Sequence, residues 1–223
     1  MQKRKIIIGT YDTDKDGKWT LSAWELTRAK AFESYADVPG HGQIDLSTAL
    51  TDGEPYYESR EFTATLESSE GTRLEREQRI SDMVNAIDGW RLNIQLPDDA
   101  THYITGRIRV EKLYNDQAHC AVLVKAVCDP WRYSISETVV RKTATTTEQT
   151  VVLTNKGRRS MVPRITVANS DVRIKFTAST GQKNINVTPG NHNYVDFYLK
   201  PGTMSVTYSG TGTITFTYRE AVL

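Results

Sequence analysis

A chain of 223 residues is long enough for one large β domain or for two ordinary domains, each with a core of its own. Charged residues make up 25% of it and give a formal net charge of +1, which excludes a strong overall attraction to nucleic acid or to membranes. The charge is unevenly spread. Residues 1–133 contain 17 Lys and Arg against 22 Asp and Glu (−5), and residues 134–223 contain 11 against 5 (+6).

The N-terminal residues carry three positive charges followed by only three isoleucines, at positions 6–8. A secretory signal has roughly 7–15 apolar residues at this point. The longest apolar run, residues 120–124, is far below the roughly 20 residues that cross a bilayer. We therefore expect a soluble protein made in a cytoplasm, with no membrane partner.

The D-x-D-x-D-G pattern of residues 12–17 matches the opening of a calcium-binding EF-hand loop. The twelfth position of such a loop supplies a bidentate glutamate, but here it is Ala23. The flanking residues 5–11 and 19–26 have the pattern of strands. We predict a polar hairpin turn without a metal, and a calcium site is the alternative.

Polar and apolar residues alternate with a period of two over much of the chain, which is typical of half-buried antiparallel strands. Residues 120–128 are apolar on both faces except at Lys125, which predicts a central strand. The alternating apolar residues are Phe62, Ala64 and Leu66; Trp90, Leu92, Ile94 and Leu96; Val172, Ile174 and Phe176; Met204, Val206 and Tyr208; and Ile214, Phe216 and Tyr218.

One helix is predicted, over residues 73–87. Thr72 and Glu75 form a capping box, in which each side chain binds a free backbone amide at the helix start. Gly89 provides the stop, because glycine adopts the left-handed conformation readily. A single apolar stripe would face a sheet, and it consists of Ile80, Met83, Val84 and Ile87.

A domain boundary is predicted just after residues 129–133, giving domains at 1–133 and 134–223. The second domain has many short strands and should form a small β-sandwich. Residues 143–150 hold several threonines and no large apolar residue, so we predict an exposed hairpin or linker there. Cys120 and Cys128 would lie roughly 26 Å apart on one strand, too far for a disulfide, and should be buried free thiols.

No catalytic, cofactor or metal site is predicted. The four histidines are scattered, and the chain has no nucleophile elbow and no phosphate-binding glycine loop. Asp98 and Asp99 follow Pro97, so they are better explained as a loop corner than as a catalytic pair. We therefore expect a protein that is not an enzyme.

A carbohydrate-binding module is a second hypothesis for residues 134–223. Sugar-binding sandwiches use aromatic platforms, and Tyr194 and Tyr198 are the candidate platform here. Filling of the sandwich core is the more frequent role of aromatic residues at strand spacing. The aromatic residues concerned are Tyr194, Phe197, Tyr198, Tyr208, Phe216 and Tyr218.

Ten short sequence motifs follow one another along nearly the whole chain. They are residues 38–47, 56–62, 85–89, 96–99, 102–107, 129–133, 155–157, 162–167, 210–212 and 218–219. In this order the motifs, among them Val38 to Ser47 and Asp129 to Tyr133, resemble those of siphophage distal tail proteins. His41 is a departure, because an arginine or asparagine is more familiar there.

The resemblance implies a structural tail-tip hub. Its N-terminal domain would be a β-sandwich with one helix and an extended hairpin, and six copies would form a ring around a channel for DNA. The ring would join the major tail tube protein to the tail-associated tip protein, at the tail tip of a virion assembled in a bacterial cytoplasm. The C-terminal domain would be a galectin-like sandwich that in some phages carries receptor-binding proteins.

All four tryptophans lie in the first domain, and tryptophan is enriched at the centre of protein interfaces. Trp90 alternates with polar residues and should be a core residue. Trp19 and Trp24 are therefore the predicted interface residues of the ring.

Overall fold

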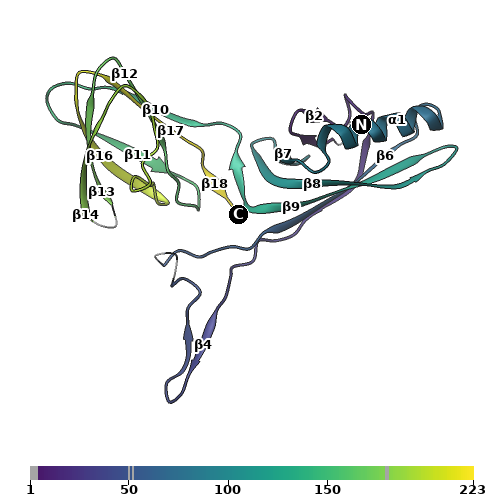
Figure 1. The fold of residues 1–223 in the computed structure, drawn as a ribbon, viewed down its shortest axis with the longest axis horizontal. Helices are drawn as coiled ribbons and strands as arrows, with labels where there is room; N and C mark the ends of the chain where they lie inside the picture. Colours follow the sequence, from purple (N-terminus) through teal and green to yellow (C-terminus); the bar gives the residue numbers. More distant parts are fainter. Residues whose placement is uncertain (1–4, 50, 52, 179–180) are drawn as a thin grey trace. The chain divides into compact units, whose positions relative to one another are not determined.

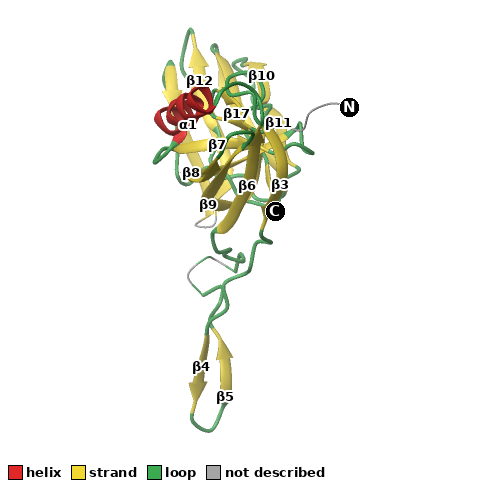
Figure 2. Ribbon diagram, turned by 90° about the vertical axis from the view of Figure 1, so that its right-hand side faces the viewer, coloured by secondary structure: helices red, strands yellow, loops and turns green. Residues whose placement is uncertain are grey.

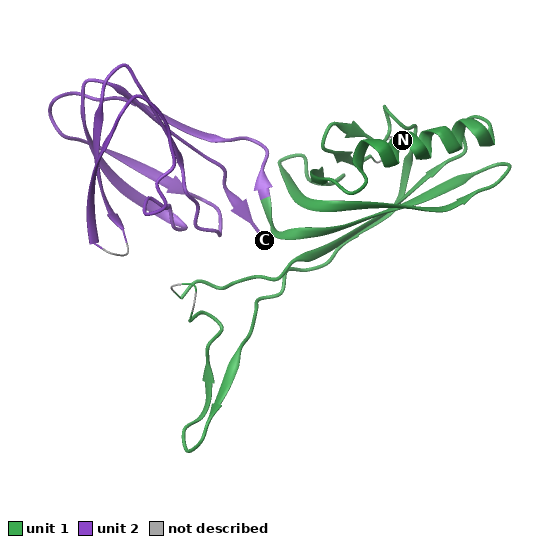
Figure 3. Ribbon diagram, viewed as in Figure 1, with its two compact units in different colours: residues 1–132 green, residues 133–223 purple. Residues whose placement is uncertain are grey.

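The computed structural model describes residues 5–49, 51, 53–178 and 181–223. The chain divides into two compact units, residues 1–132 (unit 1) and residues 133–223 (unit 2), which Figure 3 distinguishes by colour. Each unit has its own cluster of buried apolar side chains.

Unit 1 is built on one antiparallel sheet in the order β2-β1-β7-β8-β9-β6-β3 (Figure 1). β9 lies between β6 and β8, so the prediction of a central strand at residues 120–128 is confirmed. The strands are β1 (Ile7–Ile8), β2 (Tyr11–Asp12), β3 (Thr20–Leu26), β6 (Arg60–Ser68), β7 (Arg91–Gln95), β8 (His102–Asn115) and β9 (Cys120–Ser134).

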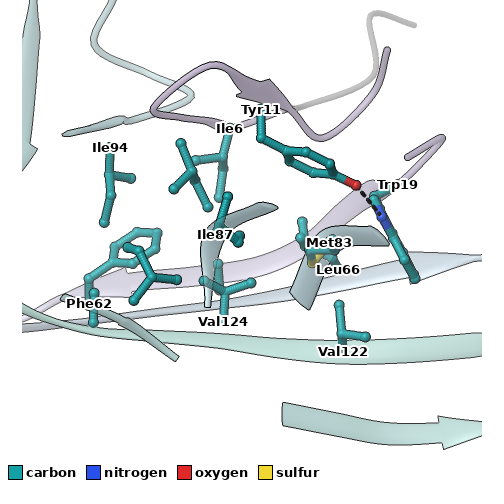
Figure 4. Packing of buried hydrophobic residues seen from close by; sticks show 14 of the residues in the cluster. Ile6, Tyr11, Trp19, Phe62, Leu66, Met83, Ile87, Ile94, Val122 and Val124 are labelled. Atoms are coloured by element: carbon teal, nitrogen blue, oxygen red, sulfur yellow. Dashed lines mark hydrogen bonds between the residues drawn. The ribbon is translucent and has the colours of Figure 1, made fainter. Parts of the chain in front are cut away.

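The sheet curls around the core of unit 1. Figure 4 shows Ile6, Tyr11 and Ile94 on one side of this core, and Phe62 and Val124 on the other. Alternation along β6 buries Phe62, Ala64 and Leu66, as the sequence predicted. Strands β2 and β7 thus face strands β6 and β9 across a shared apolar layer.

The single helix described, α1 (Arg73–Ile87), has the predicted bounds and the predicted capping box. Thr72 Oγ1 accepts from the Glu75 amide at 3.3 Å, and a Glu75 carboxylate oxygen accepts from the Thr72 amide at 2.6 Å. The helix packs against β8 and β2. No helix in the described part of the chain is long and apolar enough to cross a membrane.

The buried stripe of α1 differs from the prediction at two positions. Ile80, Met83 and Ile87 are buried, but Val84 is exposed because it lies at the margin of the face toward the sheet. Arg76 is buried instead, with 1% of its surface exposed.

A two-stranded hairpin, β4 (Tyr35–Val38) and β5 (Gly42–Asp45), extends from unit 1 (Figure 2). Its strands pair with each other and with no other strand of the described residues. Gly40 and Gly42, at its tip, both have positive φ values, which L-residues with side chains disfavour. The extended hairpin that the resemblance implied is therefore present.

Unit 2 is a β-sandwich of two four-stranded sheets, in the orders β10-β17-β12-β15 and β11-β16-β13-β14. Residues 143–150 connect β10 in one sheet to β11 in the other, so they form a crossover and not a hairpin. The strands are β10 (Thr138–Thr143), β11 (Gln149–Asn155), β12 (Arg164–Ala168), β13 (Val172–Ala178), β14 (Gly181–Val187), β15 (Gly190–His192), β16 (Gly202–Gly210) and β17 (Thr213–Tyr218).

The predicted alternation in unit 2 is confirmed, because its apolar residues line the space between the two sheets. Phe197 packs edge-on against Phe176 and stacks on Phe216, with ring centroids 4.7 and 5.8 Å apart. β18 (Ala221–Val222) pairs with β9 near its end, where the Ser134 amide donates to the Glu220 carbonyl.

Cys120 and Cys128 are both buried and free. Burial, reinforced by the Asp129 carboxylate, raises the pKa of the Cys128 thiol to about 12. Burial also raises the pKa of Cys120. These thiols are packing residues of the core and stay protonated near neutral pH.

Candidate assembly interface

The segment from residue 27 to residue 59, here called the arm, contains the hairpin and the two connections that lead to it. Its strands form only a two-stranded ladder, and such a hairpin is at best marginally stable in water without a partner surface. Five large apolar side chains of the arm are nevertheless more than two-fifths exposed: Phe32, Tyr35, Ile44, Leu46 and Tyr56. Exposed apolar side chains of this size are candidates for a protein interface.

The root of the arm is fixed to the sheet of unit 1. Arg60, at the start of β6, is 8% exposed, and its guanidinium donates to the carbonyls of Thr27 at 2.6 Å and Pro130 at 3.4 Å. Burial, with the nearby Arg132 charge, lowers the pKa of Arg60 from its ordinary value. Tyr57 packs edge-on against Trp131, with ring centroids 5.2 Å apart. These contacts anchor the arm to the sheet of unit 1 where the arm begins and ends.

The structure corrects two of the tryptophan predictions. Trp19 is fully buried and its indole N–H donates to the Tyr11 hydroxyl at 3.2 Å, so it cannot be a surface anchor. Lys18, immediately before it, has a φ of 53°, and this turn directs the chain back into the core. Trp24 is half-buried against the core and keeps an accessible surface, so its interface role stays a prediction.

Trp90 was expected in the core but is 63% exposed. It follows the Gly89 turn and precedes β7, and its carbonyl accepts from the Ile108 amide. The backbone thus joins the sheet at its margin, while the indole lies beyond the apolar layer. Trp90 replaces Trp19 as an accessible tryptophan of unit 1.

The acidic loop at residues 12–17 binds its own backbone. Asp12 accepts from the amides of Asp14 and Lys15 and from the Lys5 ammonium at 2.6 Å, and Asp16 accepts from the Asp12 amide at 2.7 Å. Among the residues that the structure describes, no group of three or more acidic, His or Cys side chains could hold a metal. The prediction of a hairpin was wrong, because β2 pairs with β1 and the next strand, β3, pairs with β6.

Asp99 forms the predicted loop corner and joins it to β8 and β9. Its carboxylate binds Thr101, the His102 ring at 3.2 Å and the Arg132 guanidinium at 3.3 Å. Burial alone would raise the pKa of Asp99, but the hydrogen bonds from Thr101 and His102 outweigh it and lower the pKa to about 2.

The Asp99 pKa predicts a loss of stability in acid. The ordinary pKa is 3.8 and the folded one is about 2, so ionised Asp99 stabilises the fold above pH 4. This stabilisation is lost as the pH falls from about 4 to about 2 and amounts to about 1–2 kcal/mol after solvent screening. Urea unfolding at pH 5 and pH 2.5 should show a smaller acid loss in Asp99→Asn than in the parent chain. Equal losses in both proteins would contradict this assignment.

The two residues of the candidate glycan platform have different surroundings, and their shared role stays a prediction. Tyr198 lines a pocket in unit 2, whereas Tyr194 stacks on His192 with ring centroids 5.9 Å apart and packs against the core. The other four aromatic residues considered, Phe197, Tyr208, Phe216 and Tyr218, are buried.

The comparison with solved structures bears on the whole chain. The fold is similar to that of the SPP1 Dit protein, whose crystal structure is described as a paradigm of the hub adsorption apparatus in phages infecting Gram-positive bacteria. The TM-score is 0.67 and the sequence identity 14%, over 96% of this chain and 98% of the SPP1 chain. No family model and no curated protein matches the sequence. The two proteins thus share a fold over nearly the full length of both chains.

Proposed function

We propose that this protein is a structural component of a phage tail, a hub at the tail tip that joins the major tail tube protein to the tail-associated tip protein. The observation that carries this proposal is the similarity in fold to SPP1 Dit over nearly the full length of both chains. A partial match to one unit would support only a shared module. The order of the family-like phrases along the sequence supports the same function independently.

The arm supports self-assembly as part of this proposal. Its exposed apolar side chains need a covering surface, and a neighbouring copy in a ring provides the same surface to every arm. Contacts of this head-to-tail kind close into a ring when the rotation between copies is a whole fraction of a turn. The family resemblance sets the number of copies at six. Arm residues, with Trp24 and Trp90, are then the contact candidates.

The ring would surround a channel for DNA and would hold receptor-binding proteins through unit 2. Unit 1 carries a net charge of −5, which disfavours tight binding of the passing nucleic acid. The role is non-enzymatic, and its place is the virion tail tip, after assembly in the bacterial host cytoplasm.

Separation of the two units tests the proposal. Residues 1–132 alone should self-associate, whereas residues 133–223 alone should remain monomeric, because the arm belongs to the first fragment and the second carries a net charge of +6. Sedimentation velocity at matched concentration measures both masses. Circular dichroism should first show that each fragment keeps its β structure.

The matched control is the first fragment with Tyr35→Ser and Ile44→Ser, two exposed arm positions whose replacement leaves the core of unit 1 unchanged. This variant should remain monomeric and folded. If residues 133–223 form the oligomer while residues 1–132 stay single, the assignment of the ring to unit 1 is wrong.

A further inference from the structure

A pocket of about 300 Å³ opens in unit 2, on residues that the tail-hub proposal does not use. This volume is at the small end of ligand-binding pockets and suits a ligand the size of one sugar ring. The pocket is lined by Tyr133, Arg159, Ser160, Met161, Val162, Tyr198, Arg219 and Ala221.

The wall of the pocket is held in place by a buried asparagine. Asn155 is 2% exposed, and its side-chain amide donates to the carbonyls of Arg159 at 2.9 Å and Leu199 at 3.1 Å. Its side-chain oxygen accepts from the Gly157 amide at 2.9 Å. Met161 and Leu199 exchange two backbone hydrogen bonds, of 2.7 and 3.1 Å. These hydrogen bonds hold the backbone of the segment that carries Arg159.

The pocket favours an anion. The Arg159 guanidinium lies 5.9 Å from the centre of the Tyr133 ring and donates to the Tyr133 hydroxyl. That bond uses one of the five N–H donors of an arginine. Arg219 also lines the pocket, but its guanidinium is paired with the Glu137 carboxylate at 3.1 Å and donates to the Ser134 carbonyl at 2.9 Å. Arg159 is therefore the cation considered for a ligand. None of the residues that line the pocket is acidic, and residues 133–223 carry a net charge of +6.

The chemistry of the remaining lining residues selects among anions. Tyr133, Ser160 and Tyr198 carry hydroxyl groups, which both donate and accept, whereas guanidinium groups only donate. A lone carboxylate or phosphate group needs donors only, while a sugar acid offers hydroxyl groups as well. Met161 and Val162 supply an apolar surface for the C–H face of a ring.

We propose that this pocket binds an acidic sugar. The carboxylate or phosphate group of the sugar binds Arg159, and the hydroxyl groups of the sugar face Tyr133, Ser160 and Tyr198. The site differs from an aromatic platform, because a cation already lies over each of two rings: Arg159 over Tyr133, and Lys200 over Tyr198 at 5.8 Å. The anionic group, not ring stacking, then determines selectivity. This inference is independent of whether unit 1 forms a ring.

Saturation-transfer NMR on the full chain tests the proposal with four probes: glucuronic acid, glucose 6-phosphate, glucose, and the amide of N-acetylaspartate. The two acidic sugars should give transfer signals that weaken with added salt, and glucose should give much weaker ones. A stronger signal from glucuronic acid would indicate a carboxylate ligand, and a stronger signal from glucose 6-phosphate would indicate a phosphate ligand. Signals from the aspartate derivative that match or exceed those of the acidic sugars would overturn the assignment in favour of an acidic peptide.

The adjacent arginines provide a matched pair of variants. Arg159→Gln should weaken binding of the acidic sugars by about tenfold or more, the effect of losing a charge-assisted hydrogen bond. Arg158→Gln removes the same charge one residue earlier, at an exposed position outside the pocket lining, and should change binding less than about twofold. Equal effects of the two variants, or equal signals from glucose and glucuronic acid, would exclude the proposed site.

Discussion

Arg76→Met is expected to destabilise unit 1 by about 3–5 kcal/mol. The Arg76 guanidinium is buried and donates to three carbonyl groups, those of Gly71 at 2.5 Å, Asp116 at 2.8 Å and Gln117 at 3.0 Å. It also binds the Asn115 side-chain oxygen at 3.3 Å. Methionine fills a similar volume but leaves these buried acceptors without a donor, and each such loss costs roughly 1–3 kcal/mol.

Urea unfolding followed by tryptophan fluorescence measures this effect, because all four tryptophans lie in unit 1. Arg73→Met is the matched control, since Arg73 is exposed on the same helix, and it should change the unfolding free energy by less than about 0.5 kcal/mol. A similar unfolding midpoint for Arg76→Met and Arg73→Met would show that the buried contacts of Arg76 contribute little.

Gly212→Ala is expected to destabilise unit 2 by about 3 kcal/mol or more, because it forces backbone atoms apart. A Cβ atom at Gly212 would lie 2.0 Å from the Ser170 carbonyl oxygen and 2.9 Å from that of Ala168. Ala168 ends β12 and Ser170 lies in the turn that leads to β13. Both oxygens belong to the main chain, so no side-chain rotation relieves the overlap. The Gly212 carbonyl also accepts from the Ala144 amide, which a shift of the turn would weaken.

Amide hydrogen exchange read along β16 and β17 measures this loss, since unit 2 has no tryptophan. Gly202→Ala is the comparison: nothing lies within 4 Å of its Cβ position, and only its φ of +111° opposes a side chain. Its cost should be about 1 kcal/mol. If Gly202→Ala accelerated exchange as much as Gly212→Ala, the close approach would not be the cause.

Elements defined by local chemistry could be predicted from the sequence. The bounds of α1 follow from the Thr72 capping box and the Gly89 stop, both of which act within a few residues. The alternating strands of both units were predictable in the same way, because burial of one sheet face imposes a period of two. The predicted absence of a disulfide between Cys120 and Cys128 required only the rise per residue of a strand.

Features that depend on distant parts of the chain could not be predicted. The pairing of β3 with β6, and not with β2, is determined by how the sheet curls. The burial of Trp19 and the exposure of Trp90 reflect where each indole meets the edge of the core. Arg76 did give a signal, since it lies four residues before Ile80 and continues the buried stripe, but its charge argued against burial.

The candidate assembly interface was only partly predictable. The family-like phrases implied an extended hairpin, yet the exposed apolar residues of the arm carry no periodic signal of their own. Their significance appears only when the hairpin is seen to pair with nothing else among the described residues. The pocket of unit 2 likewise brings together residues from positions 133 to 221, which no local pattern connects.

Electron microscopy of the purified full chain, with native mass spectrometry of the same sample, tests the central claim most directly. The account predicts rings with a central hole and a mass of six chains, and loss of these rings in the Tyr35→Ser, Ile44→Ser variant with the fold intact. A closed ring of another copy number, a two-fold dimer, or a protein that stays monomeric at the highest attainable concentration would contradict it.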